Sequence, residues 1–172
     1  GGAGNDTLKF EESGSNTTEL TLTTGGSTNF ENIIGTGGAE TIKGDANANK
    51  LEGKGANDIL YGYAGNDTLE GDGGNDTLYG GNDNDTLKGE AGDDTLDGGT
   101  GTDTLTGGNG TDTFVIRAGD GGSAITDADT IYDFTDGTDI IGMSGLNYSE
   151  LTIEQGTGSY SSHVVVKKTD TG

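Results

Sequence analysis

One apolar residue recurs every nine residues through the middle of this chain, and most of the positions between are polar or glycine. In the clean units the apolar residue stands between two polar β-forming residues, as in Thr104-Leu105-Thr106. Such alternation is typical of a short strand with one inward and two outward side chains. The series comprises Ile42, Leu51, Leu60, Leu69, Leu78, Leu87, Leu96, Leu105 and Phe114, and Ile33 extends it backwards by one step.

Glycine marks the start of each nine-residue unit, and the clean units 98–106 and 107–115 have glycine at positions one, two and four. Because glycine tolerates positive φ, the first six residues of a unit are predicted to turn tightly, with converging carbonyl groups. Another clean copy, residues 1–9, lies outside the continuous array. The first glycines are Gly35, Gly44, Gly53, Gly62, Gly71, Gly80, Gly89, Gly98 and Gly107.

Two such units predict one coil of a solenoid, with a strand and a turn on each side. Stacked coils form two parallel sheets around a thin core, which buries the apolar residue that a single unit cannot bury. Ile42, Leu60, Leu78, Leu96 and Phe114 would line one sheet, and Leu51, Leu69, Leu87 and Leu105 the other. The predicted fold class is therefore all-β: a parallel β-roll (β-helix solenoid) of nine-residue repeats with β-strand caps.

The sixth position of the units is mostly aspartate, and stacking collects these side chains at the two edges of the roll. Neighbours in a column would lie about 4.8 Å apart, where carboxylates repel one another unless a cation intervenes. Carboxylates with exposed carbonyls suit Ca²⁺ better than zinc or copper, and Mg²⁺ prefers a tighter octahedron. One edge would carry Asp58, Asp76, Asp94 and Asp112, and the other Asp67, Asp85 and Asp103.

The composition agrees with a fold that an external cation completes. The 172 residues include 30 Asp and Glu against 8 Lys and Arg, a formal net charge of -22, and only 27% are hydrophobic. Such chains are typically disordered, and the absence of Cys removes disulfides and thiolate metal sites. A pI near 4.1 excludes the basic face of a nucleic-acid binder. No apolar run approaches the roughly 20 residues of a membrane span.

The units resemble the GGxGxDxUx nonapeptides of RTX (repeats-in-toxin) proteins, which form calcium-binding parallel β-helices. The resemblance implies that each ion lies between turns 18 residues apart, held by sixth-position carboxylates and carbonyls of the glycine-rich turn. It implies about five to eight Ca²⁺ ions. The expected metal ligands are Asp58, Asp67, Asp76, Asp85, Asp94, Asp103 and Asp112, with Gly62, Gly71, Gly80, Gly89, Gly98 and Gly107.

Three positions depart from the repeat. Glu40 is one methylene longer than aspartate and Asn49 supplies no charge, so calcium sites that use these two residues are less expected than the others. Asp83 occupies a fourth position, where it either adds a ligand or distorts the turn.

Both ends of the chain differ from the array of residues 35–115. Residues 1–34 are expected to hold a partial repeat and capping strands; Glu19 to Thr23 would pair back on the first coil, or the segment is an irregular spacer. Residues 129–146 resemble the stretch that caps RTX rolls, which makes Asp129 and Asp139 further candidate ligands. Residues 116–172 are thus expected to be a C-terminal β-cap, truncated before a type I secretion signal, with later strands at 152–153 and 163–167.

The resemblance implies a secreted or surface-attached, monomeric module that is unfolded at low calcium and folds in extracellular calcium. Its partners would be calcium and type I secretion machinery, without nucleic-acid binding or membrane insertion. The parent protein would be a large adhesin-type protein or, alternatively, a hydrolase carrying an accessory RTX tail. No catalysis is expected, because Ser144 lacks a nucleophile elbow and the lone His163 lacks an evident partner. Ice or ligand binding by threonine ladders is a weaker alternative, because the third position varies between units.

Overall fold

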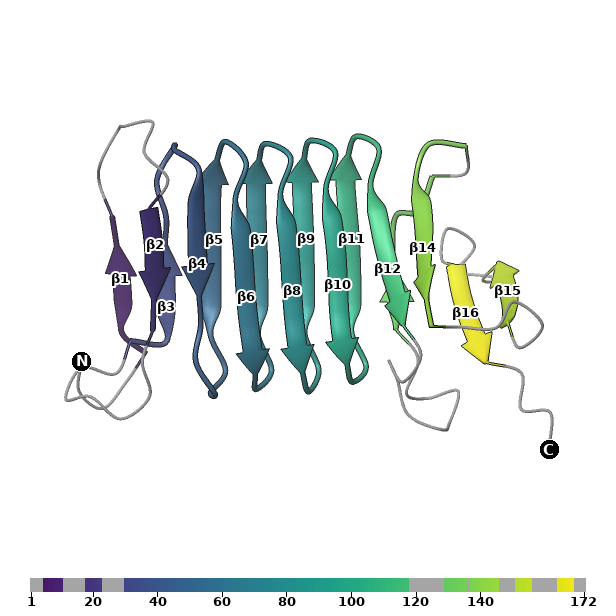
Figure 1. Cartoon of the computed structure of the whole chain (residues 1–172), viewed down its shortest axis with the longest axis horizontal. Helices are drawn as coiled ribbons and strands as arrows, with labels where there is room; N and C mark the ends of the chain where they lie inside the picture. The colour runs from purple at the N-terminus through teal and green to yellow at the C-terminus, as the bar shows by residue number, and fades with distance from the viewer. Residues whose placement is uncertain are drawn as a thin grey trace.

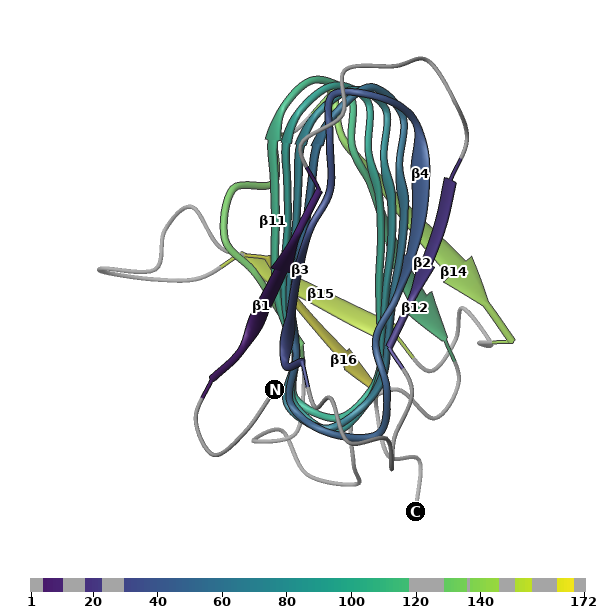
Figure 2. The same cartoon turned by 90° about the vertical axis from the view of Figure 1, so that its left-hand side faces the viewer.

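Strands and short turns alternate along the whole described chain and wind into a flattened solenoid (Figures 1 and 2). The computed structural model describes residues 5–10, 18–22, 30–117, 129–135, 137–145, 151–155 and 164–168. Within these residues, no helical segment has the length and apolar character needed to cross a bilayer.

Successive strands fall alternately on two sheets, as the nine-residue period predicts. The nine-stranded sheet contains, in spatial order, β1 (Thr7–Lys9), β3 (Asn32–Ile34), β5 (Lys50–Gly55), β7 (Thr68–Gly73), β9 (Thr86–Ala91), β11 (Thr104–Asn109), β13 (Thr130–Ile131), β16 (Val164–Lys168) and β15 (Leu151–Gln155). The seven-stranded sheet contains β14 (Ile140–Ser144), β12 (Thr113–Arg117), β10 (Thr95–Thr100), β8 (Thr77–Asn82), β6 (Ile59–Ala64), β4 (Glu40–Lys43) and β2 (Thr18–Thr21).

The pairing register brings equivalent residues of units 18 apart into contact. Leu60 pairs with Leu78 on one sheet and Leu69 with Leu87 on the other, both in parallel. All the periodic apolar residues from Ile33 to Phe114 are 0% exposed. The predicted all-β parallel roll and the division of its core between two sheets are confirmed.

The predicted lengths of strand and turn were wrong. β7 covers six residues, Thr68–Gly73, which leaves residues 74–76 for the turn. Burial alternates through the first four residues of this strand, so Leu69 and Gly71 both face the interior and are buried. The first-position glycine is therefore part of the strand, at an inward-facing position where it adds no side chain to the core.

The first repeat is part of the roll in space, although residues 10–31 separate its strand, β1, from the neighbouring strand of the same sheet, β3. β1 pairs in parallel with β3, placing Leu8 against Ile33, and Asn32 Nδ2 donates to Thr7 Oγ1 at 3.1 Å. β2 pairs in parallel with β4, placing Leu20 against Ile42. Glu19 to Thr21 thus form a strand on the roll, as one of the two alternatives predicted, and Thr23 lies outside the described residues.

The C-terminal segment continues both sheets before the pairing changes direction. β13 and β14 extend the parallel order, with Ile131 beside Leu105 and Ile141 beside Phe114. β16 then pairs antiparallel with β13 and with β15, so a hairpin ends the nine-stranded sheet. The strand expected at 152–153 is present within β15, and β16 covers 164–167 of the strand expected at 163–167, whereas His163 lies outside the described residues.

Candidate metal-binding turns

The sixth-position carboxylates stack in two columns, one at each edge of the roll. In each column, a backbone N–H of one coil donates to the Oδ1 of the aspartate 18 residues later. Along one edge the donor–acceptor pairs are Glu40–Asp58, Asp58–Asp76 and Asp76–Asp94 at 2.7 Å and Asp94–Asp112 at 3.0 Å. Along the other they are Asn49–Asp67 at 2.7 Å and Asp67–Asp85 and Asp85–Asp103 at 2.8 Å.

The second oxygen of every one of these carboxylates has no hydrogen-bond partner. The seven Oδ2 atoms are buried, and the side chains that carry them are at most 2% exposed. Leaving a buried acceptor unpaired is costly, and far more so when it bears a charge. The residues are Asp58, Asp67, Asp76, Asp85, Asp94, Asp103 and Asp112.

The first-position glycine makes the room in which this oxygen lies. A Cβ on Gly71 would collide with Oδ2 of Asp76 and lie 2.9 Å from the carbonyl oxygen of Gly89. Gly53 has the same relation to Asp58 Oδ2 and the Gly71 carbonyl, which would lie 2.9 Å from its Cβ. A carboxylate oxygen and a carbonyl of the next coil therefore converge on the same small space in successive units.

Burial also changes the acidity of the columns. Desolvation raises the pKa of Asp58, Asp67 and Asp94 to about 7 and that of Asp85 to about 8, although a backbone N–H bound to each opposes the rise. The pKa values of the other three, Asp76, Asp103 and Asp112, are raised for the same reason. Without a cation, the turns thus disfavour the ionised form that a metal ligand requires.

The two candidate ligands of the cap take the places that the next aspartates of the columns would occupy. Asp103 N–H donates to Asp129 Oδ1 at 3.0 Å, and Asp112 N–H donates to Asp139 Oδ1 at 3.1 Å. Asp139 differs from the repeat aspartates because its Oδ2 accepts a hydrogen bond from Thr135 N–H at 2.8 Å. The columns therefore extend into the cap, and only one oxygen of Asp139 continues the pattern.

The departures from the repeat are accommodated by local hydrogen bonds. Oε2 of Glu40 accepts from Thr36 N–H at 3.1 Å, and Oδ1 of Asn49 accepts from Asp45 N–H at 2.8 Å. Asp83 adopts a φ of 75°, and its Oδ2 accepts from Gly65 N–H at 3.1 Å. Asp83 thus keeps the left-handed conformation seen at fourth-position glycines, and the turn retains its shape.

The fifth position of the units forms a second ladder of hydrogen bonds, which was not predicted from the sequence. Asn57 Oδ1 accepts from Asn75 N–H at 2.9 Å, Asn75 Oδ1 from Asp93 N–H at 3.1 Å, and Asp93 Oδ1 from Thr111 N–H at 2.8 Å. The opposite edge repeats this with Asn66, Asn84 and Thr102. These side chains bond to the following coil, whereas the sixth-position side chains bond to the preceding one. The Asn or Asp that recurs directly before the sixth position could have predicted this ladder from the sequence.

Two further carboxylates were also missed, and both already have partners. Asp133 accepts from Gly107 N–H at 2.9 Å and from Gly108 N–H at 2.7 Å, one bond to each oxygen. Asp97 is 2% exposed and forms an ion pair with Arg117. Burial raises the pKa of Asp97 although the guanidinium of Arg117 opposes that rise. Neither carboxylate belongs to the columns.

The donor set fits a hard cation that accepts carbonyl ligands. Among the described residues, no three Asp, Glu, His or Cys side chains are gathered closely enough to form a metal site by themselves. Carboxylates and backbone carbonyls therefore have to share the coordination, as they do for Ca²⁺. The unpaired Oδ2 atoms, and the carbonyls beside them, supply such oxygens at both edges.

Comparison with known families identifies the repeats. The model of the RTX calcium-binding nonapeptide repeat matches residues 25–60, 34–69, 44–78, 52–87 and 79–114, which together cover more than half of the chain. The chain belongs to this family, whose repeats bind calcium. No curated protein matches it.

Proposed function

We propose that this chain is a calcium-switched folding module. The observation that supports it most is the set of seven buried Oδ2 atoms without partners, each beside a first-position glycine. Calcium supplies the positive charge that these oxygens lack. Because the sites do not exist in the unfolded chain, calcium binding energy becomes folding energy.

The proposed ligands follow the columns. The side chains are Asp58, Asp67, Asp76, Asp85, Asp94, Asp103 and Asp112, with Asp129 and Asp139 at the cap. The carbonyls are those of Gly62, Gly71, Gly80, Gly89, Gly98 and Gly107. The roll of residues 35–115 would then hold most of about five to eight ions, between the segments 1–34 and 116–172.

The cellular role that we propose is secretion followed by folding outside the cell. At the low free calcium of a bacterial interior, repulsion within the columns opposes folding, and the chain remains able to pass through a type I channel. Extracellular calcium then closes the roll, which stabilises a secreted or surface adhesin-type parent. A secreted hydrolase with this module as an accessory domain is the alternative, and the sequence of the parent distinguishes the two.

The β-roll is a structural calcium-binding module and not a catalytic fold. Ice binding by outward ladders receives less support, because a flat binding face needs identical residues in successive coils. The third positions Asn82 and Thr100 are joined by a hydrogen bond of 3.1 Å, but Ala64 and Ala91 interrupt the series.

Calcium titration of the whole chain tests the proposal. Far-UV circular dichroism should change from a largely unfolded to a β spectrum as calcium is added to chelated protein, and calorimetry should give about five to eight ions per chain. Magnesium at the same concentration is the control and should fail to produce the transition. A chain that is already fully β-structured in excess chelator would refute the proposal.

A further inference from the structure

The turns of the first coils differ from the others in having their oxygens satisfied from within the turn. Both carboxylate oxygens of Glu40 accept hydrogen bonds from Thr36, one from its N–H and one from its hydroxyl. Thr36 Oγ1 in turn accepts from Gly38 N–H at 3.1 Å. Neither carboxylate oxygen of Glu40 is therefore left without a hydrogen-bond partner in this turn.

Asn49 closes the next turn in the same way. Its Oδ1 accepts from Asp45 N–H at 2.8 Å, and Asp45 Oδ1 accepts from Asn47 N–H at 2.9 Å. The unpaired buried atom of Asn49 is Nδ2, which is a hydrogen-bond donor and cannot ligate a metal. From Asp58 onward, each sixth-position side chain instead leaves an acceptor unpaired.

Charge divides the roll at nearly the same place. Residues 35–61 carry three lysines against four acidic residues, a net charge of -1. Residues 62–115 carry one lysine against twelve acidic residues, a net charge of -11. Self-repulsion in the absence of calcium is therefore concentrated in the later coils.

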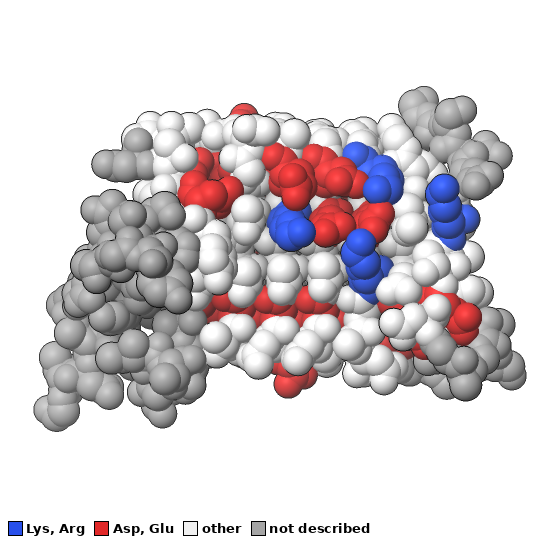
Figure 3. Space-filling model, turned by 180° about the vertical axis from the view of Figure 1, so that it is seen from behind, with Lys and Arg blue, Asp and Glu red and all other residues white. Residues whose placement is uncertain are grey.

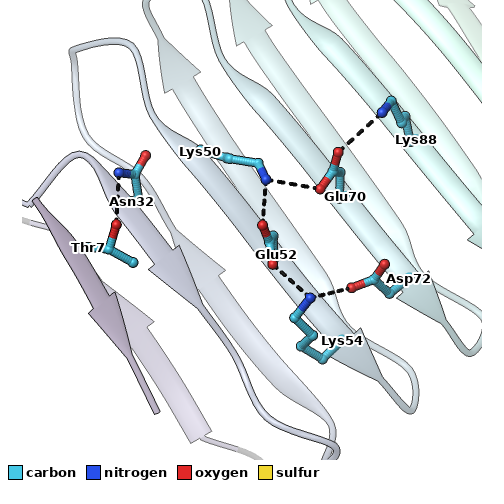
Figure 4. A network of polar contacts seen from close by, with 8 residues as sticks. All are labelled: Thr7, Asn32, Lys50, Glu52, Lys54, Glu70, Asp72 and Lys88. Carbon is cyan, nitrogen blue, oxygen red and sulfur yellow. Dashed lines mark hydrogen bonds and ion pairs between the residues drawn. The ribbon is translucent and has the colours of Figure 1, made fainter. Parts of the chain in front are cut away.

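A network of ion pairs ties the first coils to the beginning of the acidic ones (Figure 4). Figure 3 shows these charges gathered on the outer face of the nine-stranded sheet, above a row of acidic side chains at its edge. Lysines on β5 and β9 alternate with carboxylates on β5 and β7. The Nζ–O distances are 2.5 Å for Lys50–Glu52, 3.2 Å for Lys50–Glu70, 2.7 Å for Lys54–Glu52, 3.0 Å for Lys54–Asp72 and 3.2 Å for Lys88–Glu70.

The N-terminal end also has a broader apolar core than the regular repeat. Leu20 and Leu22 are buried with Ile33 and Ile42, and Phe10 and Phe30 pack against this cluster. On the seven-stranded sheet, Lys43 forms an ion pair of 2.9 Å with Glu19. None of these interactions requires a metal ion.

We propose that β1 to β5 form a calcium-independent template on which the acidic coils close when calcium is present. The switch then acts from the Asp58 turn onward, on β6 to β12. Closure proceeds from the N-terminal end, where β5 is already paired with β3 and presents its other edge to β7. The inference adds a regulated order of folding to the proposed function, and it relies on that function only for the response of the acidic coils.

Hydrogen–deuterium exchange of the whole chain, with and without chelator, tests the template. In excess chelator, amides of β4 and β5 should exchange at least about tenfold more slowly than those of β8 to β11. Calcium should then protect β8 to β11. Equal, unprotected exchange of all strands in chelator, with calcium protecting all of them, would overturn the template and leave the proposed function standing. A lack of calcium effect on β8 to β11 would overturn the proposed function.

Asn49→Asp gives the turn of residues 44–49 the sixth-position aspartate of the repeat, and this variant tests the template most directly. It places a buried charge where an amide is now, so β4 and β5 should lose about tenfold protection in chelator and recover it in calcium. Asn57→Asp introduces the same change at an exposed fifth position and should alter exchange less than about twofold. Equal behaviour of the two variants would contradict the template.

Thr36→Val keeps the proposal testable if Asn49→Asp fails to fold. It removes the hydroxyl bonded to Glu40 without adding charge. Protection of β4 should fall in chelator, with protection of β10 in calcium unchanged. Unchanged protection of β4 would count against the role of this turn.

Discussion

The coils of β3 to β5 and those from the Asp58 turn onward, β6 to β12, share one backbone but satisfy their turns differently. Both have the same parallel register and the same fully buried apolar residue in each strand. In the first region, Glu40 and Asn49 bond to their own turns, and in the second, each aspartate leaves Oδ2 unpaired. The comparison teaches that the nine-residue period determines the fold, while a single position in each unit determines its need for a metal.

Substituting the first-position glycine should produce the largest difference between the regions. Gly71→Ala places a Cβ against Asp76 Oδ2 and the Gly89 carbonyl, so it should lower the free energy of unfolding in calcium by about 2–3 kcal/mol. Chemical denaturation in calcium measures this. Gly73→Ala is the matched control, because its Cβ would have only one neighbour, the Lys54 carbonyl oxygen, at 3.8 Å.

The corresponding substitution in the first coils sharpens this contrast. Gly44→Ala would collide with Asn49 Oδ1, so it should destabilise β5 with or without calcium. If Gly71→Ala reduced stability no more than Gly73→Ala, the space beside Gly71 would not be needed for the carboxylate.

Removing one charge from a column should have the next largest effect. Asp76→Asn retains an acceptor for Asp58 N–H but loses the carboxylate that two adjoining sites are proposed to share. The calcium concentration at the folding midpoint should rise roughly tenfold, because two sites lose a charged ligand together. Asp93→Asn, at the exposed fifth position beside this column, should shift that midpoint less than about twofold. An unchanged midpoint for Asp76→Asn would refute the register of the sites.

In chelator, the stability of the two regions should change with pH in opposite directions. The folded pKa values of Asp58 and Asp85 are raised, to about 7 and about 8, so their stability contribution is present at low pH and lost as pH rises through these values. The Glu52 pKa is lowered by hydrogen bonds from Lys50 and Lys54, so its contribution is present at neutral pH and lost on acidification.

Circular dichroism and hydrogen exchange in chelator between pH 8.5 and 5.5 measure this response. Acidification should increase structure in the acidic coils and should raise the calcium midpoint, because protons compete for the same oxygens. Loss of structure in β8 to β11 on acidification would contradict the assigned direction.

Relief of the left-handed backbone at Lys54 should give the smallest effect. Lys54 has a φ of 86° at a second position, so Lys54→Gly relieves backbone strain while removing two partly exposed ion pairs. It should be more stable than Lys54→Ala by about 1 kcal/mol, measured by thermal unfolding in calcium. Equal stability of the two variants would show that the left-handed backbone at Lys54 carries little strain.

The spacing of the apolar residues sufficed to predict the two sheets and both aspartate columns. It did not predict the length of the strands, because a glycine such as Gly71 contributes no side chain to an alternation pattern yet faces the core. The fifth-position ladder was missed because Asn75 and Asp93 also occur as ordinary turn residues. The stacking of β1 on β3 depends on pairing across residues 10–31, which no local pattern records.

The alternation of strands between two sheets restricts how such an array changes in length during evolution. Insertion or loss of 18 residues returns every downstream strand to its own sheet, so Glu70 stays beside Glu52 and Lys88 and Tyr79 beside Tyr61. A single nine-residue indel would exchange the sheets, placing tyrosines among the ion pairs and moving each aspartate to the opposite edge. The array is therefore expected to gain or lose repeats in pairs and not singly.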